Sequence, residues 1–229
     1  MSTAAIVLAA GQGKRMNSPV KKQYIEIAGR PLLYYPLKAF EESCVDAVVV
    51  VASAEDVSFV RSDIIERFGF GKVSAVVAGS DERFRSVRCG LEVVTQDYVL
   101  IHDGARPMIT ALLIDRCVAE VEREGAVAVG VRSKDTVKIV DEGLKICETP
   151  PREQIWIAQT PQAFSRKLLS EAYKKLEELG RAGSYIPTDD AMLVQDMTGV
   201  KAVMLEGDYT NIKVTTPDDL DMVERILKN

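Results

Sequence analysis

Short apolar runs alternate along this chain with longer segments of helical periodicity. The runs are rich in Val and Ile, which is typical of strands buried on both faces of a sheet. They span Ala4–Ala9, Ala47–Ala52, Val73–Val77 and Tyr98–Ile101. The segments between and after them span Pro31–Glu42, Ala54–Arg67, Glu82–Val94 and Ala111–Glu124. Each is long enough to cross between parallel strands, so the pattern predicts an α/β protein.

The second half of the chain continues the alternation. It offers an apolar strand at Ala126–Val131, a helix at Phe164–Leu179, a late strand at Val200–Leu205 and a final helix at Pro217–Leu227. Proline suits the first turn of that last helix. We expect a Rossmann-like, doubly wound, mostly parallel sheet, and a length of 229 residues favours one domain over residues 1–229.

One segment breaks this rhythm, because Thr136–Val140 and Leu144–Cys147 alternate with period two around the turn sequence Asp141–Gly143. The pattern predicts an inserted β-hairpin arm at about residues 134–153. It has too few large apolar residues for a core of its own, so it needs another surface to be stable. That surface belongs either to a second subunit or to the hairpin's own domain.

Net charge and the length of the apolar runs limit the kinds of partner that we expect for this chain. Lys plus Arg number 29 against 34 Asp plus Glu, which gives a net charge of −5 and argues against a nucleic-acid-binding surface. No apolar run approaches the roughly 18 residues of a membrane span, and the first residues lack the basic region of a signal peptide. We therefore expect a cytoplasmic protein with no membrane partner.

Cysteine and histidine restrict the chemistry. The four cysteines form no CxxC pair and no zinc-type spacing, so reduced thiols are expected. His102 is the one histidine, which excludes a multi-histidine metal site and allows a Ser-His-Asp triad only through that residue. We interpret His102 as structural, so chemistry must come from Lys, Arg, Asp and backbone groups.

A glycine loop, Ala9–Met16, follows the first predicted strand at the edge where open α/β sheets bind ligands. Met16 replaces the third glycine of the dinucleotide fingerprint, and Arg15 replaces the Ser or Thr of a Walker loop. Small residues let backbone amides approach phosphate oxygens, while Arg15 and Lys22 supply cations. The loop therefore predicts a polyphosphate site, and a tight turn with a solvated basic loop is the alternative.

Asp103 ends the fourth predicted strand on the same edge of the sheet. Mg²⁺ often takes one or two protein carboxylates and completes its shell with phosphate and water, so Asp103 is a candidate ligand. Its alternative role is that of a turn or cap residue.

Three further segments have local explanations. Asp81 and Ser86 follow Ser80, where the pattern favours a helix cap at Ser80 over contact with a nucleobase. Thr188 precedes two aspartates and an apolar helix, and there too we favour a cap. Lys213 follows a short extended segment and is, in isolation, a solvated surface lysine.

Seven ordered motifs together resemble the 2-C-methyl-D-erythritol 4-phosphate cytidylyltransferases of the non-mevalonate isoprenoid pathway. They are Ala9–Met16, Lys22–Tyr24, Gly79–Arg83, His102–Pro107, Thr160–Gln162, Thr188–Ala191 and Asn211–Thr215. The resemblance covers nearly the whole chain. Leu8, Ser80, Gly104 and Asp190 depart from the family pattern by small changes, and the segment Gly207–Thr210 receives no role.

The resemblance implies a role for each matched position. Arg15, Lys22, Lys213 and Arg152 would be catalytic, the first three by meeting charge on the α-phosphate of CTP. Nucleotide binding would fall to Ala9, Ala10, Gly11, Gly13, Asp81 and Ser86. The polyol phosphate would be bound by Arg106, Thr136, Arg152, Thr160 and Thr188. Asp103 would hold Mg²⁺, and the hairpin would be the arm of a homodimer.

The implied reaction joins CMP from CTP to the phosphate of methylerythritol 4-phosphate and releases pyrophosphate. The alternatives are a ribitol 5-phosphate cytidylyltransferase, which shares the nucleotide motifs, and a nucleotide-binding homologue without turnover. A dehydrogenase is disfavoured by Met16 at the missing glycine position.

Overall fold

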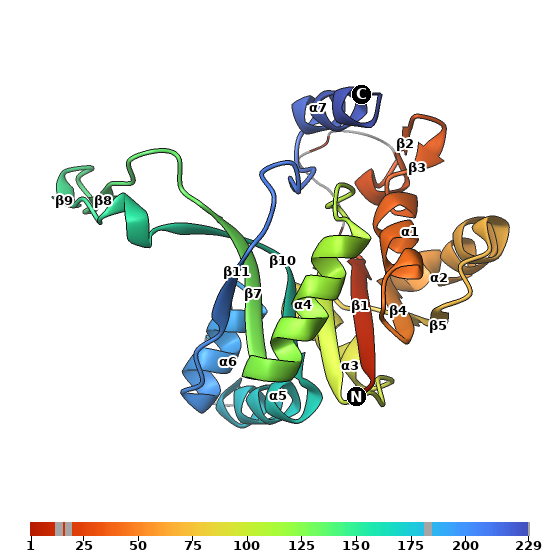
Figure 1. Ribbon diagram of the computed structural model, residues 1–229, viewed down its shortest axis with the longest axis horizontal. Helices are drawn as coiled ribbons and strands as arrows, with labels where there is room; N and C mark the ends of the chain where they lie inside the picture. Colours follow the sequence, from red (N-terminus) through yellow and green to blue (C-terminus); the bar gives the residue numbers. More distant parts are fainter. Residues whose placement is uncertain (12–15, 17–19, 181–184, 229) are drawn as a thin grey trace.

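The computed structural model describes residues 1–11, 16, 20–180 and 185–228. A seven-stranded sheet with the order β11-β7-β10-β6-β1-β4-β5 forms its centre (Figure 1). The strands are β1 (Thr3–Ala9), β4 (Ala47–Ala52), β5 (Val73–Ala78), β6 (Tyr98–Asp103), β7 (Ala126–Arg132), β10 (Trp156–Ser165) and β11 (Val203–Glu206). Because β1 pairs in parallel with both β4 and β6, the chain winds outward in two directions from β1. The predicted fold class is confirmed.

Helices cover both faces of the sheet. One face carries α1 (Tyr34–Glu42) and α4 (Ala111–Glu124), and the other carries α3 (Arg83–Leu91), α5 (Arg166–Gly180) and α6 (Asp190–Thr198). Along β1, Ala5 and Val7 join the first core while Ala4 and Ile6 join the second. This alternation follows from the period of two in a strand, and it explains why the run is apolar throughout.

The strand β10 was not predicted. It runs antiparallel to both β6 and β7, and it begins at Trp156 and includes Phe164, which we expected to start a helix. Polar residues and Pro161 interrupt any apolar period in this segment, so the sequence carries no strand signal there. The helix α5 begins two residues later than expected, at Arg166.

Several other boundaries differ from expectation. The helix α1 begins at Tyr34 and not at Pro31, α3 spans Arg83–Leu91 and not Glu82–Val94, and β5 and β6 continue to Ala78 and Asp103. The segment expected to be one helix from Ala54 consists of a 3-10 turn, Ala54–Asp56, a single α turn, α2 (Val57–Phe59), and a π-helical stretch, Val60–Glu66. Its buried residues still cover the sheet beside α1. The late strand β11 begins at Val203, three residues later than predicted.

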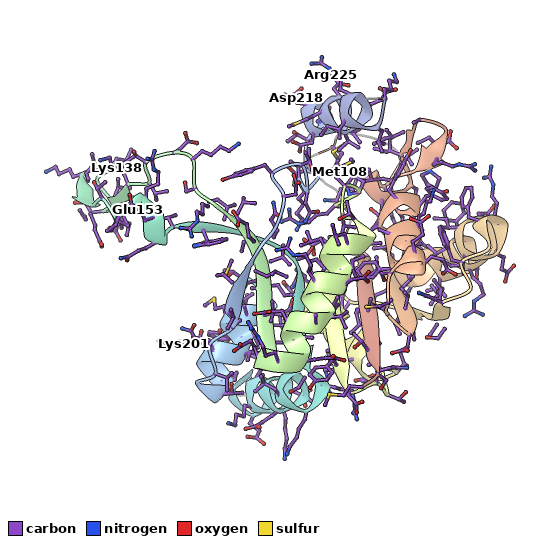
Figure 2. The ribbon with its side chains drawn as sticks, viewed as in Figure 1. Met108, Lys138, Glu153, Lys201, Asp218 and Arg225 are labelled. Carbon is purple, nitrogen blue, oxygen red and sulfur yellow. The ribbon has the colours of Figure 1, made fainter. Side chains whose placement is uncertain are left out.

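The predicted hairpin arm is present. Its strands are β8 (Ile139–Val140) and β9 (Ile146–Glu148), which pair antiparallel. The carboxylate of Asp141 accepts hydrogen bonds from the amides of Gly143 and Lys145 and closes the turn. The arm projects away from the sheet beyond β7 and β10, and Figure 2 shows Lys138 and Glu153 on it.

A third small core lies at the carboxyl edge of the sheet. There α7 (Pro217–Leu227) packs near the short pair β2 (Glu26–Ile27) and β3 (Arg30–Pro31). Thr216 and Asp219 form a capping box at the start of α7, whose predicted bounds are confirmed. Across the described residues, every helix is too short or too polar to cross a membrane.

Candidate active site

The carboxyl ends of β1 and β6 meet where the strand order reverses. Leu8 of β1 lies directly opposite Asp103 of β6, and the amide of Gly104 donates to the carbonyl of Leu8 at 2.9 Å. This is the position at which open α/β sheets hold ligands. The start of the glycine loop and the Asp103 carboxylate are therefore brought to one place by strand register.

A pocket of about 280 Å³ opens at this edge. Its lining includes many of the residues that the motifs singled out. Among the described residues it contains Ala9, Ala10, Gly11, Lys22, Asp81, Ser86, Asp103 and Lys213, together with Ser80, Glu82 and Arg83. Gly13 and Arg15 lie outside the described residues. Eight predicted site residues from five segments thus share one cavity.

Asp103 lies in this pocket between two positively charged side chains. It is 7 % exposed, and Nε of Arg83 lies 3.2 Å from its Oδ1 while Nζ of Lys213 lies 2.6 Å from its Oδ2. Burial alone would raise the pKa of Asp103, but the charges of Arg83 and Lys213 hold that pKa well below its usual range. The carboxylate is therefore ionised at neutral pH.

Lys22 reaches the pocket from the 3-10 turn Lys22–Tyr24. The side chain of Gln23 ties this turn to the end of β1 by donating to the carbonyl of Ala9 at 2.6 Å. The preceding Lys21 pairs with Glu55 at 2.6 Å and Asp56 at 2.5 Å, away from the pocket lining. Nζ of Lys22 donates to the carbonyl of Val214 at 3.0 Å. Two adjacent lysines therefore have different surroundings.

The segment after β5 forms the far wall of the pocket. The predicted cap at Ser80 is wrong, because α3 begins at Arg83 and its N-cap position is Glu82, which makes no capping bond with its side chain. Instead the hydroxyl of Ser86 contacts the amide and the carbonyl of Ser80 at 3.0 and 3.1 Å. A Cβ on Gly79 would stand 2.8 Å from that hydroxyl, so the turn needs glycine there.

Two buried residues, His102 and Thr160, form hydrogen bonds next to Asp103. The hydroxyl of Thr160 accepts from the amide of Asp103 at 3.1 Å and lies 3.0 Å from Nδ1 of His102. His102 is fully buried, and burial lowers its pKa to about 4. It therefore stays neutral near pH 7, which agrees with the structural role expected for it.

The chain segment that follows β11 carries Lys213 and binds the side chain of Arg106. The guanidinium of Arg106 donates to the carbonyl of Asn211 at 2.8 Å, and the amide of Val214 donates to the carbonyl of Ala105 at 2.8 Å. Asp208, for which the sequence suggested no role, accepts from the amide and the hydroxyl of Thr210. Its carboxylate closes a local turn.

Comparison with known proteins fits this geometry. The family model described as IspD, 2-C-methyl-D-erythritol 4-phosphate cytidylyltransferase, matches residues 3–229. The chain belongs to this family. A 2-C-methyl-D-erythritol 4-phosphate cytidylyltransferase of Lachnoclostridium phytofermentans is 49% identical over 225 residues, which cover 98% of this chain and 95% of that protein. The resemblance found in the seven motifs is confirmed.

Solved structures of cytidylyltransferases share the fold. A 4-diphosphocytidyl-2C-methyl-D-erythritol synthase from Anaerococcus prevotii aligns with a TM-score of 0.86 at 32% identity, covering 100% of this chain and 96% of that one. The cytidylyltransferase of Thermus thermophilus aligns with a TM-score of 0.78 at 28% identity and covers all of both chains.

None of the five residues that the cytidylyltransferase resemblance assigned to the polyol phosphate lines this pocket. Arg106 and Thr160 lie next to it, because Arg106 follows the lining residue Ala105 and the hydroxyl of Thr160 accepts from the amide of Asp103. Thr136 and Arg152 are exposed on the arm, where Arg152 donates to the carbonyl of Lys134 at 3.4 Å. Thr188 is exposed before α6, and its hydroxyl contacts the sulfur of Met192. The chain's own fold therefore does not gather all of the predicted residues.

Sequence reasoning assigned no site role to the pair Arg83 and Asp190. Nη1 of Arg83 lies 2.7 Å from Oδ2 of Asp190, which is 1 % exposed. The cap expected in this segment is Asp189, whose side chain accepts from the amide of Met192. Asp190 is not a cap but the buried partner of a pocket arginine. A contact between residues so far apart in the chain leaves no local sequence signal.

Proposed function

We propose that this chain transfers CMP from CTP to 2-C-methyl-D-erythritol 4-phosphate and releases pyrophosphate. The observation that carries the proposal is the pocket at the ends of β1 and β6, where Lys22, Lys213 and Arg83 lie beside Asp103 and the start of the glycine loop. Cationic side chains beside a loop of small residues suit a polyphosphate. Membership of the cytidylyltransferase family identifies the nucleotide and its acceptor.

The chemistry needs positioning and charge. The attacking group is the phosphate of the polyol, which is already an anion, so no side chain has to remove a proton before it attacks the α-phosphorus. The two substrates repel each other, and charge on the phosphoryl oxygens must be neutralised as the new bond forms. Lys22 and Lys213 supply that charge in our proposal, together with Arg15 from the glycine loop.

The nucleotide is proposed to lie along the pocket wall. The backbone amides of Ala9, Ala10 and Gly11 would face its phosphates, with Gly13 completing the loop, because small residues permit a close approach. Asp81 and Ser86 line the same pocket on the α3 side. Their position supports the assignment of these two residues to the cytosine.

Magnesium is part of the proposal, with Asp103 as its protein ligand. The donor set fits, because Asp103 is an ionised carboxylate in the pocket lining, and Mg²⁺ needs few protein ligands when phosphates and water supply the rest. Across the described residues no cluster of three or more acidic, His or Cys side chains offers an alternative cage. When bound, the ion would offset phosphate charge.

The acceptor polyol phosphate is assigned to Arg106, Thr160 and Thr188 of the main body and to Thr136 and Arg152 of the arm. We propose that the last two act in a homodimer, across the interface. Leu144 and Ile146 on the arm are 81 % and 62 % exposed, an apolar surface that a second subunit would cover. All four cysteines are free, which suits the reducing cytoplasm that we propose as its location.

Product analysis tests this function. The purified chain is incubated with CTP, Mg²⁺ and an equal mixture of methylerythritol 4-phosphate and ribitol 5-phosphate. We expect pyrophosphate release with the CDP-methylerythritol product dominating by mass spectrometry. A dominant CDP-ribitol product would instead identify ribitol 5-phosphate as the acceptor. CTP binding without pyrophosphate release from either polyol would show that the chain is a binder and not an enzyme.

A further inference from the structure

Asp190 is a buried carboxylate with no assigned function. It is 1 % exposed and is not part of the lining of the nucleotide pocket. Both of its oxygens have partners, because Oδ2 accepts from Nη1 of Arg83 at 2.7 Å and Oδ1 accepts from the hydroxyl of Tyr173 at 3.1 Å. Burial of a carboxylate without a partner is unfavourable, so these two contacts explain how Asp190 can be buried.

Arg83 links this carboxylate to the pocket. Its Nε lies 3.2 Å from Asp103 while its Nη1 lies 2.7 Å from Asp190, so one guanidinium bridges two carboxylates. A planar fork of fixed geometry can make both contacts at once, whereas the single nitrogen of a lysine cannot replace it at both. The orientation of Arg83 against Asp103 therefore depends on where Asp190 is held.

Gln162 of β10 fixes the start of α6, and with it Asp190. Its Oε1 accepts from the backbone amides of Asp190 and Ala191, both at 3.0 Å, and its Nε2 donates to Asp189 at 2.9 Å. Gln162 lies opposite Ile101 of β6, two residues before Asp103. Asp190 is thus anchored to the same pair of strands that carries the proposed metal ligand.

Lys213 approaches Asp103 in a different setting. It comes from the loop between β11 and α7, its side chain is 37% exposed, and it contacts Oδ2, the oxygen that Arg83 does not contact. The two cations on Asp103 therefore differ: one is held in the fold by a second, buried carboxylate, and the other is at the open side of the pocket.

We propose that Asp190 is a positioning residue: it holds Arg83 against Oδ1 of Asp103 and so presents the other oxygen, beside Lys213, to the metal–nucleotide complex. The inference rests on the proposed function of the pocket. It gives a purpose to two motifs, because Gln162 of Thr160–Gln162 anchors Asp190 of Thr188–Ala191. Disturbing the partner of a metal-ligating group commonly weakens metal binding.

The test compares Asp190→Asn with Asp196→Asn. The second variant is matched, since it makes the same change on the same helix at an exposed residue, whose side chain accepts from the hydroxyl of Tyr185. The readout is the dissociation constant of Mn²⁺–CTP, measured by water-proton relaxation, with thermal unfolding recorded for each variant. We expect Asp190→Asn to raise this constant about 10-fold or more, and Asp196→Asn to change it by less than about 2-fold.

Two results overturn the proposal: wild-type binding by Asp190→Asn, or equal weakening by both variants in proportion to lost thermal stability. If Asp190→Asn does not fold, Arg83→Lys must show the same weakening, and wild-type binding by that variant overturns it. Where both fold, the double variant should bind as Arg83→Lys does, because Asp190 acts through Arg83. Binding of Mn²⁺–CTP by the wild type is independent of the acceptor, so failure of the acceptor assignment is seen separately, in product analysis.

Discussion

The ammonium nitrogen of Lys213 lies 2.6 Å from Oδ2 of Asp103, at the carboxyl end of β6. Burial would raise the pKa of Asp103, yet Arg83 and Lys213 hold that pKa below its ordinary value of 3.8. The stability that these pairs contribute is therefore present above that value and is lost as the pH falls through the lower pKa of the folded state. At neutral pH the site holds a permanent anion between two cations.

Replacing this anion tests its role directly. Asp103→Asn keeps the shape of the side chain but removes the charge proposed to bind Mg²⁺. We expect kcat to fall by about 100-fold or more, the scale for losing one preorganised electrostatic group. The unfolding midpoint should fall as well, because the pairs with Arg83 and Lys213 are lost, but the variant should still unfold cooperatively. Turnover at several Mg²⁺ concentrations and thermal unfolding by circular dichroism are measured together. Near-normal turnover with an unchanged Mg²⁺ requirement would exclude Asp103 as the ligand.

Lys22 and its neighbour Lys21 offer a matched pair of variants. Lys22 lines the pocket, whereas Lys21 pairs with Glu55 and Asp56. If Lys22 meets charge that develops during phosphoryl transfer, Lys22→Ala should lower kcat by about 100-fold or more and raise KM for CTP much less. Lys21→Ala should change kcat by only a few fold. Initial rates over a range of CTP concentrations separate the two constants.

The opposite pattern would contradict this role. A Lys22→Ala enzyme with normal kcat and a raised KM for CTP would make Lys22 a ground-state binding residue. Equal losses of kcat in both variants would indicate that the whole 3-10 turn has moved, because Lys21 anchors that turn.

The sequence predicted the parallel part of the sheet because its strands are apolar on both faces. In β1, neighbouring residues such as Ile6 and Val7 enter opposite cores, so the whole run must be apolar. The antiparallel strand β10 left no such signal. Its buried Gln162 is polar because it satisfies backbone amides of α6, a need that only the folded structure reveals.

The candidate site, like the sheet, could be predicted from the sequence only in part. Strand ends are visible in a sequence, and the register of β1 and β6 then brings the start of the glycine loop and Asp103 together. Contacts with residues of distant helices leave no local pattern in a sequence, so the pairing of Asp190 with Arg83 was not predicted. For Arg152, the proposed contribution to a site would require a second chain, which the contacts within one chain do not include.

The burial of His102 predicts how the stability of the folded protein depends on pH. Its ring is fully buried, lies 5.4 Å from the ring of Phe40 between centroids, and has a pKa lowered by burial from 6.5 to about 4. The unfolded chain therefore binds a proton below pH 6.5 while the folded chain does so only below about pH 4. Stability is fully present above pH 6.5 and is lost as the pH falls, by about 2 kcal/mol at pH 5.

Two measurements check this, both without added metal. The chain has one histidine, so a single ring resonance reports its titration by NMR. Urea unfolding at pH 7 and pH 5 gives the change in the free energy of unfolding, and a His102→Gln variant should lose less stability over that range. Titration of the resonance between pH 6 and 7 in the folded protein would show that the ring is not buried in neutral form.

The proposed dimer predicts recovery of activity between two inactive chains. Lys22 belongs to the nucleotide pocket, whereas Arg152 lies on the arm that projects away from the sheet. If the arm completes the partner's site, a two-fold dimer pairs the Lys22 of one chain with the Arg152 of the other, reciprocally. Lys22→Ala and Arg152→Ala enzymes, dissociated and reassociated at equal concentrations, should then regain activity.

The expected recovery follows from counting sites. In a hybrid dimer both lesions fall in one site and neither falls in the other. Random reassociation makes about half of the dimers hybrids, each with one intact site of two, so activity should return to roughly a quarter of the wild type. If Arg152 served its own chain, every site would keep one lesion and mixing would restore nothing. An inactive mixture, with hybrids confirmed by native mass spectrometry, would therefore place Arg152 in its own chain's site or in none.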